Sequence, residues 1–200
     1  MFKSICGLGS FRCGRSNLAS LISRPLSNYG WQIERYHIGE EFDRDQVRYN
    51  PQMKRPVIYN PTDLLVEVRA ASVNPLDLLM IKGYGREIID SLNVITQATK
   101  CKLSYDKFPL VLGRDFAGVV RSTGAAVTKF QVGDQIWGSL SPFKQGSHCK
   151  YLVASEEELS RKPSNLSFEE AASIPYAALT AWSALFKFGG FSAREAASKR

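Results

Sequence analysis

The chain has no acidic residue at its start, little histidine, and no long apolar run. No Asp or Glu occurs before Glu34, and 200 residues contain two histidines. No stretch approaches the ~20 apolar residues that a membrane-spanning helix needs. Four cysteines are present, and none of them lies in a C-x-x-C pair: Cys6, Cys13, Cys101 and Cys149. This spacing argues against structural zinc and against a disulfide framework.

The acid-free start has the composition of an import signal. Residues 1–33 carry four basic residues and many serines among apolar side chains, which is typical of a mitochondrial transit peptide. We therefore predict a transit peptide over residues 1–27 and a mitochondrial location, with the matrix as the expected compartment. A secretory signal and a tail without function remain alternatives.

The positive net charge invites a nucleic-acid interpretation, but its distribution weakens that interpretation. The formal net charge is +7, and four of the 26 basic residues lie in residues 1–33. The remaining basic residues are nearly balanced by 19 acidic ones and form no cluster. Proteins that bind nucleic acid usually present a basic stripe on a binding fold, so no nucleic-acid site is expected.

Short strands and tight turns dominate the expected secondary structure. Residues 64–70 alternate between apolar and charged side chains, which is the two-residue period of a half-buried strand. Further strands are expected at 31–38, 118–121, 135–138 and 148–154. Many short strands at even spacing predict a mainly β fold with a few helices, either a sandwich or a partly open barrel.

The first expected helix begins in the segment Asn-Pro-Leu-Asp at 74–77. Asn74 is a good N-cap residue, and Pro75 fits the first helical position. Asp77 lies in the first turn, where a carboxylate complements the helix dipole. Gly83 is expected to end this helix.

Two more helices are expected closer to the C-terminus. Ser167 and Glu170 form a capping box that starts the first of them, and Pro175 interrupts it. The second covers 177–187. Its apolar residues are expected to form a buried face: Ala178, Leu179, Trp182, Leu185 and Phe186.

The chain lacks the glycine turn of a dinucleotide-binding fold. Such a site needs a G-x-G-x-x-G turn that follows a strand and opens a helix, so that the backbone can approach the pyrophosphate. Gly7-Leu8-Gly9 lies in the expected transit peptide, and Gly83-Tyr84-Gly85 ends an expected helix. Both segments lack the third glycine, so neither is a credible fingerprint.

Several motifs occur in an order that is typical of one enzyme family. The most specific are AASVNPLD at 70–77, GRDFAGVV at 113–120 and ALTAW at 178–182. Over about residues 30–188 the chain resembles the N-terminal half of a medium-chain dehydrogenase/reductase of the metal-free quinone oxidoreductase type. A long insertion after Gly85 and the segments 142–146 and 173–176 narrow the resemblance to a mitochondrial branch of that family.

The resemblance implies a domain organisation. Residues 28–165 would form a GroES-like, partly open β-barrel, the alcohol dehydrogenase catalytic domain, with a polar insertion at 86–107. Residues 166–200 would be a helical segment that leads into a Rossmann domain absent from this chain, so the apolar face of 177–187 would be exposed here. On this basis we expect the 200 residues alone to bind NADPH weakly or not at all and to be inactive.

The resemblance also implies zinc-independent transfer of a hydride from NADPH to a quinone or an activated alkene. Zinc-dependent members place a cysteine near Asn74 and a histidine at the Arg114 position. Neither an amide nor a guanidinium is a plausible zinc ligand, so no zinc is expected. In this chemistry the cofactor reduces the substrate, while the protein positions the reactants and excludes water.

Three residues correspond to site residues of the family. Asn74 resembles the amide that faces the nicotinamide and the substrate, so it is a catalytic and a cofactor-binding candidate. Tyr84 resembles a phenol that lines the substrate cleft and can donate to a developing enolate oxygen. Thr180 resembles the hydroxyl that contacts the nicotinamide. Each also has an ordinary explanation, respectively a helix cap, a loop tyrosine and helix packing.

The other polar residues of interest have plainer interpretations. Arg114 and Asp115 are expected to form a structural ion pair or to anchor a turn, rather than to take part in catalysis. His37 and His148 have no partner that the sequence reveals, and surface or strand packing is expected for each.

Two other functions stay open. The mitochondrial branch implies a reticulon as a protein partner, so the chain could be a non-catalytic interaction module. A co-chaperonin of the GroES type would share only the barrel, and fold analogy alone is weak support for a function. The identity of the quinone or alkene substrate and a dimeric state of the full-length protein are also left open.

Overall fold

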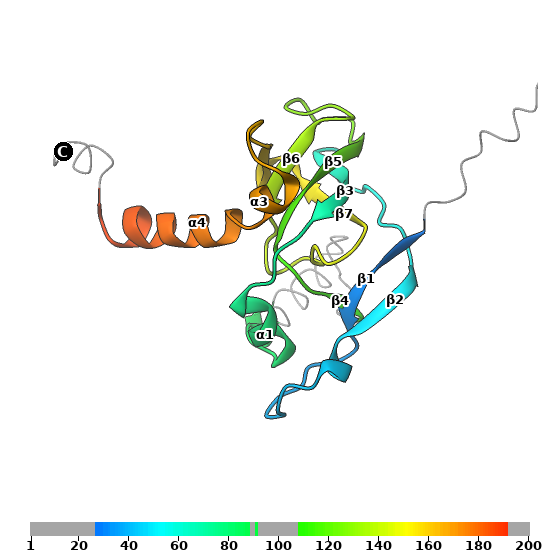
Figure 1. The fold of residues 1–200 in the computed structure, drawn as a ribbon, viewed down its shortest axis with the longest axis vertical. Helices are drawn as coiled ribbons and strands as arrows, with labels where there is room; N and C mark the ends of the chain where they lie inside the picture. The colour runs from blue at the N-terminus through cyan, green and yellow to red at the C-terminus, as the bar shows by residue number, and fades with distance from the viewer. Residues whose placement is uncertain (1–26, 89–90, 92–107, 192–200) are drawn as a thin grey trace, which may run out of the picture.

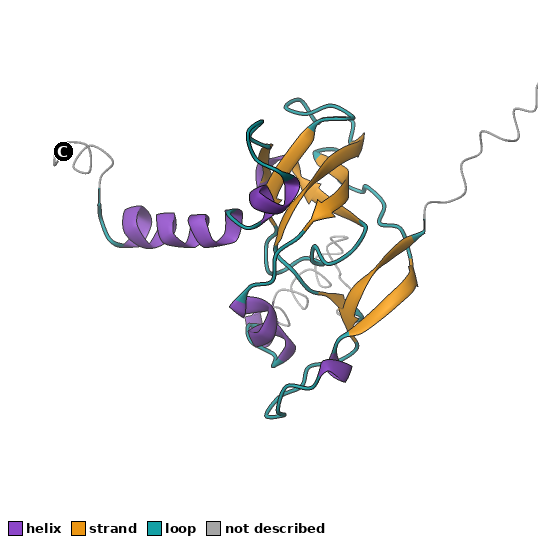
Figure 2. Ribbon diagram, in the orientation of Figure 1, coloured by secondary structure: helices purple, strands orange, loops and turns teal. Residues whose placement is uncertain are grey.

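The computed structural model describes residues 27–88, 91 and 108–191, whose strands form two antiparallel sheets (Figure 1; Figure 2). The larger sheet has the spatial order β7 (Tyr151–Ser155), β3 (Asp63–Ala70), β5 (Asp115–Thr123), β6 (Gln135–Ser139) and β8 (Leu159–Arg161). The smaller sheet has the order β2 (Arg48–Met53), β1 (Asn28–Ile33) and β4 (Leu110–Val111). The predicted mainly β fold is confirmed, and the described strands form no closed barrel.

The helices are few and short. Those with defined bounds are α1 (Pro75–Ile81), α3 (Phe168–Ala172), α4 (Pro175–Trp182), the π-helical turn η4 (Ser183–Phe188) and the 3-10 turns η2 (Arg44–Gln46) and η3 (Glu156–Glu158). The described residues 86–88 and 91 are helical as well. Figure 1 shows α3 against the larger sheet, whereas α4 and η4 project away from both sheets. In the part of the chain that the structure describes, no helix combines the length and apolarity of a membrane span.

Apolar side chains gather in two main clusters and a small third one. The first lies within the five-stranded sheet: Leu64, Val66, Phe116, Val120, Ile136, Leu140, Leu152, Ala154 and Leu159. The second joins α1 to the three-stranded sheet: Ile33, Met80, Ile81, Leu110 and Leu112. The third joins α3 to β5 through Ala117, Ala171 and Ala172, whose small side chains let the helix approach the sheet closely.

Strand β3 confirms the strand predicted at 64–70 and corrects its half-buried character. Leu64 and Val66 lie in the core, as the alternation predicts. Leu65 and Glu67 point to the opposite face and are buried as well. The alternation of residue types could not show that the second face of β3 is covered too. Part of this cover comes from long basic side chains such as Arg121, which reaches across to Glu67.

The ends of several strands differ from the predicted ones. β1 covers Asn28–Ile33 instead of 31–38, because the chain then leaves the sheet and the N–H of His37 donates to the carbonyl of Ile81 in α1 at 2.8 Å. The strands predicted at 118–121, 135–138 and 148–154 are present as β5, β6 and β7 with shifted ends. β2, β4 and β8 were not predicted, since they are very short or lack a clear alternation.

Helix α4 and its continuation η4 correct the burial expected for 177–187. Four of the five apolar side chains are exposed, with Leu179, Trp182 and Leu185 each at least half exposed, and Phe186 is half-buried. Pro175 is buried, and exposure begins within the first turn after it. Among the described residues, then, α4 is fixed mainly where it starts.

Some predictions lie outside the described residues. These include the transit peptide apart from residue 27, and the 86–107 insertion apart from 86–88 and 91. Cys6, Cys13 and Cys101 also lie there. The domain boundaries at 28–165 and 166–200 stay predictions.

Candidate active site

The buried carboxylate of Asp115 joins the start of α1 to the start of α4. Its Oδ2 accepts hydrogen bonds from Asn74 Nδ2 and from Ser72 Oγ, both at 2.8 Å. Its Oδ1 accepts a hydrogen bond from the backbone N–H of Tyr176. Hydrogen bonds to a charged, fully buried group are stronger than those between neutral groups, so this network is a firm connection.

Gly113 fixes the loop that carries Asp115. Its φ of +89° lies in the region that favours glycine, and its N–H donates to Asp77 Oδ1 at 2.8 Å. A Cβ at this position would come within 2.4 Å of the His148 ring. A side chain at position 113 would therefore strain the backbone and displace the neighbouring segment.

Arg114 anchors the same loop from the other side. Its guanidinium is fully buried and donates to the carbonyls of Ser141 and Lys144, at 2.7 and 3.0 Å. A weaker bond of 3.4 Å reaches the carbonyl of Val111. These bonds support the predicted role of Arg114 as a turn anchor.

Asn74 is both the first residue of the α1 cap and a hydrogen-bond partner of Asp115. It is the N-cap residue of α1, and the Asp77 carboxylate accepts its backbone N–H at 2.7 Å. Its side-chain Nδ2 faces Asp115, because an ionised carboxylate can only accept hydrogen bonds. The second Nδ2 contact, to Ser72 Oγ, is long at 3.3 Å. The amide is therefore oriented by Asp115 and retains a weakly used donor.

Thr180 lies on a groove between α4 and the edge of the larger sheet. The groove has a volume of about 890 Å³ and is bounded by β6, η3, β8, α4 and η4. Thr180 Oγ1 donates to the carbonyl of Tyr176 at 2.7 Å, which leaves its oxygen able to accept. Other hydroxyl groups on the wall come from Ser139, Ser141, Ser160 and Ser183.

The structure connects two of the three predicted site residues and leaves the third apart. Asn74 and Thr180 are linked through Asp115 and the first turn of α4. Of the described residues, those that line the groove include Thr180 but neither Asn74 nor Tyr84. Tyr84 lies three residues beyond the end of α1, a helix about 10 Å long that starts next to Asn74, and it is 63% exposed.

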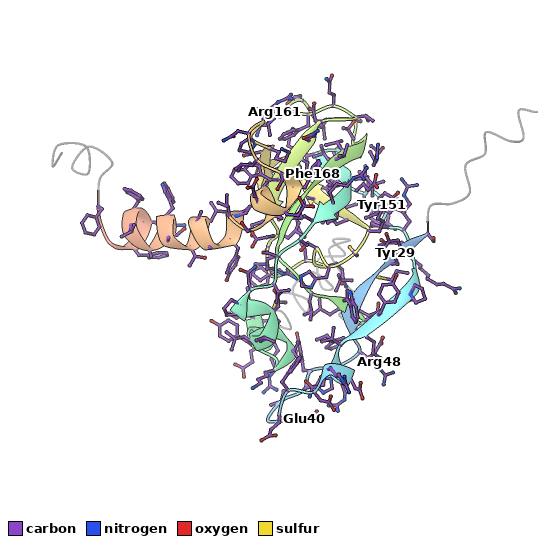
Figure 3. The ribbon with its side chains drawn as sticks, viewed as in Figure 1. Tyr29, Glu40, Arg48, Tyr151, Arg161 and Phe168 are labelled. Atoms are coloured by element: carbon purple, nitrogen blue, oxygen red, sulfur yellow. The ribbon has the colours of Figure 1, made fainter. Side chains whose placement is uncertain are left out.

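Both histidines have partners that the sequence did not reveal. His148 Nε2 lies 3.0 Å from the carbonyl of Ser72, next to the Asp115 network. His37 Nδ1 lies 2.7 Å from Glu40 Oε2. Hydrogen bonds from Arg35 and His37 lower the pKa of Glu40 to about 2. This second cluster lies in the loop that Figure 3 labels at Glu40, away from the site.

No metal site is visible in the described ranges, which contain no cluster of three His, Cys, Asp or Glu side chains suited to an ion. Burial raises the pKa of the Cys149 thiol to about 12. The thiol therefore stays protonated at neutral pH, which makes it a poor nucleophile and a poor ligand. The site offers amide, hydroxyl and carboxylate groups for orienting a ligand.

The chain matches known proteins in sequence. Residues 60–186 match the family described as the alcohol dehydrogenase GroES-like domain. The chain belongs to this family. The matched range includes Asn74, Asp115 and Thr180, so the whole Asp115 network lies within the GroES-like domain.

The relatives of this GroES-like chain are longer proteins. It is 41% identical over 170 residues to "NAD(P)H oxidoreductase RTN4IP1, mitochondrial" of Mus musculus, covering 85% of this chain and 41% of the relative. It is 41% identical over 145 residues to "Reticulon-4-interacting protein 1, mitochondrial" of Caenorhabditis elegans, covering 72% of this chain and 38% of the relative. The chain thus spans less than half the length of these curated relatives. Their designations confirm the predicted mitochondrial location.

The fold is also similar to that of solved enzymes. The quinone oxidoreductase from Coxiella burnetii superposes with a TM-score of 0.64 at 28% identity, covering 80% of this chain and 45% of that chain. Together with the sequence relatives, this similarity confirms the placement among medium-chain dehydrogenase/reductases of the quinone oxidoreductase type.

The connecting residues of the GroES-like site were not predicted. Ser72 and Tyr176 contribute a hydroxyl and a backbone N–H to the same carboxylate, from positions 43 and 61 residues away in the chain. The GRD motif drew attention to Asp115, but only as an anchor. A backbone donor such as Tyr176 N leaves no signal in a sequence, because every residue except proline carries one.

Proposed function

We propose that this chain supplies the substrate-side residues of a zinc-independent oxidoreductase of the mitochondrial matrix that reduces quinones or activated alkenes with NADPH. The observation that carries the proposal is the Asn74–Asp115–Tyr176 network, which orients one amide and ties it to the helix of Thr180. The names of the mouse and Coxiella relatives, an NAD(P)H oxidoreductase and a quinone oxidoreductase, support the same chemistry.

The described residues fit one end of the cofactor. NADPH, when bound, supplies the hydride. The groove has the volume of a small-molecule site, and Thr180 and the wall serines can bind the carboxamide of a nicotinamide. The described part offers no pyrophosphate site, since the Gly83 and Gly85 turn follows helix α1, whereas a dinucleotide-binding turn follows a strand.

Asn74 and Tyr84 would act on the substrate. The Nδ2 hydrogen that makes only the long bond to Ser72 is the donor that a carbonyl oxygen of a quinone or enone would accept. Asp115 holds the amide in place for this bond. The exposed phenol of Tyr84 is available to a developing enolate oxygen, where a preorganised donor lowers the barrier.

A chimera tests the proposal. Residues 1–200 are joined to the part of the mouse relative that lies beyond the matched residues, and NADPH oxidation is followed with a short-chain quinone. We expect activity, and a fall in kcat/KM of about 100-fold for Asn74→Ala, the loss typical of one oriented donor. Asn50→Ala, a half-buried asparagine of β2, is the matched control and should leave the rate unchanged.

Two results would contradict the proposal. One is a chimera that turns over but does not respond to Asn74→Ala or Thr180→Val. The other is an enzyme-like rate of NADPH oxidation by the 200-residue chain alone, since the pyrophosphate has no seat in its described residues.

A second function, a protein-binding module, is favoured by the apolar face of α4 and η4. Leu179, Trp182, Leu185 and Phe188 expose large apolar side chains along this segment. The name of the nematode relative points to a reticulon. Calorimetric titration of the chain with a purified reticulon would measure the affinity of such an interaction. Trp182→Ser should weaken binding, while Trp31→Ser should not. Such binding together with an inactive chimera would favour the module.

A further inference from the structure

A strip of aromatic and basic side chains runs from the three-stranded sheet onto the five-stranded sheet. Its aromatic end consists of Tyr29, Trp31 and Tyr49. Its basic end consists of Arg69, Arg121 and Lys150, grouped around Glu67. These seven residues form the aromatic–basic strip. Neither the Asp115 network nor the α4 groove uses any of them.

Strand β1 makes the aromatic–basic strip continuous. Trp31 and Tyr49 are partners in the β1–β2 register, with ring centroids 5.4 Å apart, and the Tyr29 ring lies 6.2 Å from that of Tyr49. On the other side of β1, the N–H of Lys150 donates to the carbonyl of Tyr29 at 2.8 Å. Figure 3 shows Tyr29 and Tyr151, the residue after Lys150, close together on one side of the molecule.

The basic end carries more positive charge than Glu67 can neutralise. Lys150 Nζ lies 2.6 Å from Glu67 Oε1, Arg121 Nε donates to Oε2 at 2.6 Å, and Arg69 lies 3.5 Å from Oε1. Three cations thus face one carboxylate. The basic side chains remain 25–44% exposed, whereas Glu67 is 9% exposed. The surplus positive charge therefore faces outward.

We propose that the aromatic–basic strip docks the protein on an anionic membrane surface. Tyrosine and tryptophan have an apolar body and a polar edge, and they concentrate at the level of lipid headgroups. Lysine and arginine beside them are attracted to anionic headgroups, while their apolar stems cover the neighbouring surface. The exposed rings at one end would insert at the level of the headgroups, and the surplus positive charge at the other end would face the anionic groups of the lipids.

A single-stranded nucleic acid would use the same kinds of side chain in another geometry. Bases stack in succession on ring faces that are open. Here the rings are tilted against one another, by 54° between Tyr29 and Tyr49 and by 57° between Trp31 and Tyr49. Tyr49 thus lies against both neighbours, and the three rings are not parallel, as successive bases stacked on them would require. This arrangement favours shallow insertion among headgroups.

Vesicle sedimentation with the 200-residue chain tests the proposal. One vesicle type contains phosphatidylcholine alone, and the other contains roughly one cardiolipin for every four phosphatidylcholines. We expect binding to the anionic vesicles only, and weaker binding as salt is added. Arg69→Gln should weaken binding about fivefold, since one cation near such a surface contributes about that factor. Trp31→Ala should weaken it by a similar factor, because the indole is lost from the headgroup layer.

Matched controls separate the strip from other parts of the chain. Trp182→Ala removes a comparably exposed indole from α4, and Arg44→Gln removes a cation from η2. Neither should change vesicle binding. A variant with glutamine at all four basic positions of residues 1–33 tests the acid-free start separately. In this variant, adding Trp31→Ala should still weaken vesicle binding. Arg69 and Trp31 are exposed, and circular dichroism checks that the variants stay folded.

Several outcomes would overturn the proposal. They are equal binding to both vesicle types, or strip variants that bind as well as the parent chain. Loss of binding only in the four-glutamine variant would assign membrane binding to the start of the chain. Tight binding of a single-stranded oligonucleotide that Trp31→Ala abolishes, without vesicle binding, would assign the strip to nucleic acid.

Discussion

Helices α3 and α4 are neighbours in the chain, and they are held in opposite ways. α3 has only five residues, yet Ala171 and Ala172 are buried against β5. Its start is closed by a reciprocal cap, in which Ser167 Oγ accepts the N–H of Glu170 and the Glu170 carboxylate accepts the N–H of Ser167. α4 has eight residues and exposes most of its apolar side chains.

The difference teaches that length and apolar content do not by themselves decide how firmly a helix is held. A short helix is stable when a face is buried, because most helical stability in proteins comes from packing. α4 has little such packing among the described residues, and it is tied to the sheet by the hydrogen bond of Tyr176 to Asp115. The two helices therefore respond differently to matched substitutions.

The largest expected effect comes from breaking the connection at Asp115. Asp115→Ala leaves the donors of Ser72, Asn74 and Tyr176 without their acceptor, at a cost of about 3 kcal/mol in the free energy of unfolding. Urea denaturation measures the loss, and hydrogen exchange should show faster exchange of the α4 amides with α3 unchanged. Asp45→Ala, in the exposed turn η2, is the control. Equal stability of the two variants would contradict this role of Asp115.

The same substitution in both helices sharpens the comparison. Ala171→Leu forces extra volume between α3 and β5, and it should cost about 2 kcal/mol of unfolding free energy. Ala178→Leu lies on the exposed part of α4 and should change stability by less than about 0.5 kcal/mol. Thermal and urea unfolding of the two variants provide the measurement. A large loss for Ala178→Leu would show that α4 is packed after all.

The cap of α3 should contribute less than its packing. Ser167→Ala removes the acceptor of the Glu170 N–H and should destabilise the protein by about 1 kcal/mol. Ser164→Ala, an exposed serine just before the helix, should be neutral. The urea midpoints of unfolding of the two variants measure this difference. Identical midpoints would show that the cap does not stabilise α3.

The smallest effect is expected in the pH dependence of stability. Burial opposes ionisation of Glu67, but hydrogen bonds from Lys150 and Arg121 outweigh it and leave its pKa below the usual value. A carboxyl group with a lowered pKa stabilises the fold above its unfolded pKa, and this contribution is lost as pH falls through the folded pKa. Glu67→Gln should therefore flatten the fall in stability between roughly pH 5 and pH 3.

Glu170 supplies the contrast for this pH experiment. Its pKa is also lowered, by hydrogen bonds from Ser167, but its side chain is exposed. Glu170→Gln should leave the acid limb of the stability curve nearly unchanged, since solvent screens exposed pairs. Urea midpoints across the pH range give the comparison, and an equal flattening by both variants would contradict the importance of burial.

Local patterns in the sequence predicted the parts of the fold that depend on neighbours in the chain. The alternation at 64–70, the Asn74-Pro75 helix start and the Ser167 capping box all appear in the structure. The burial of Glu67 and the partner of His148 were not predicted, because each depends on strands that are distant in sequence. Burial on the second face of a strand has no local signature.

The connections between the candidate site residues could not be predicted from the sequence, and the roles of those residues stay predictions. Motif resemblance pointed to Asn74 and Thr180, and the structure links them through Asp115. The same resemblance pointed to Tyr84, which lies three residues beyond the end of α1. The burial of Leu179 and Trp182 expected from their spacing alone is not observed, whereas the exposed apolar face expected from the resemblance is, because spacing identifies an apolar face but not what covers it.

A carboxylate is a rigid planar group, and the two oxygens of Asp115 hold different elements. Oδ1 holds the first turn of α4, and Oδ2 holds the amide at the start of α1. The separation between these two points is thereby set by the width of a single functional group. A molecule bound along α4 would therefore keep a fixed distance from the amide of Asn74 without touching Asp115, and a change in the length of this one side chain would alter that distance.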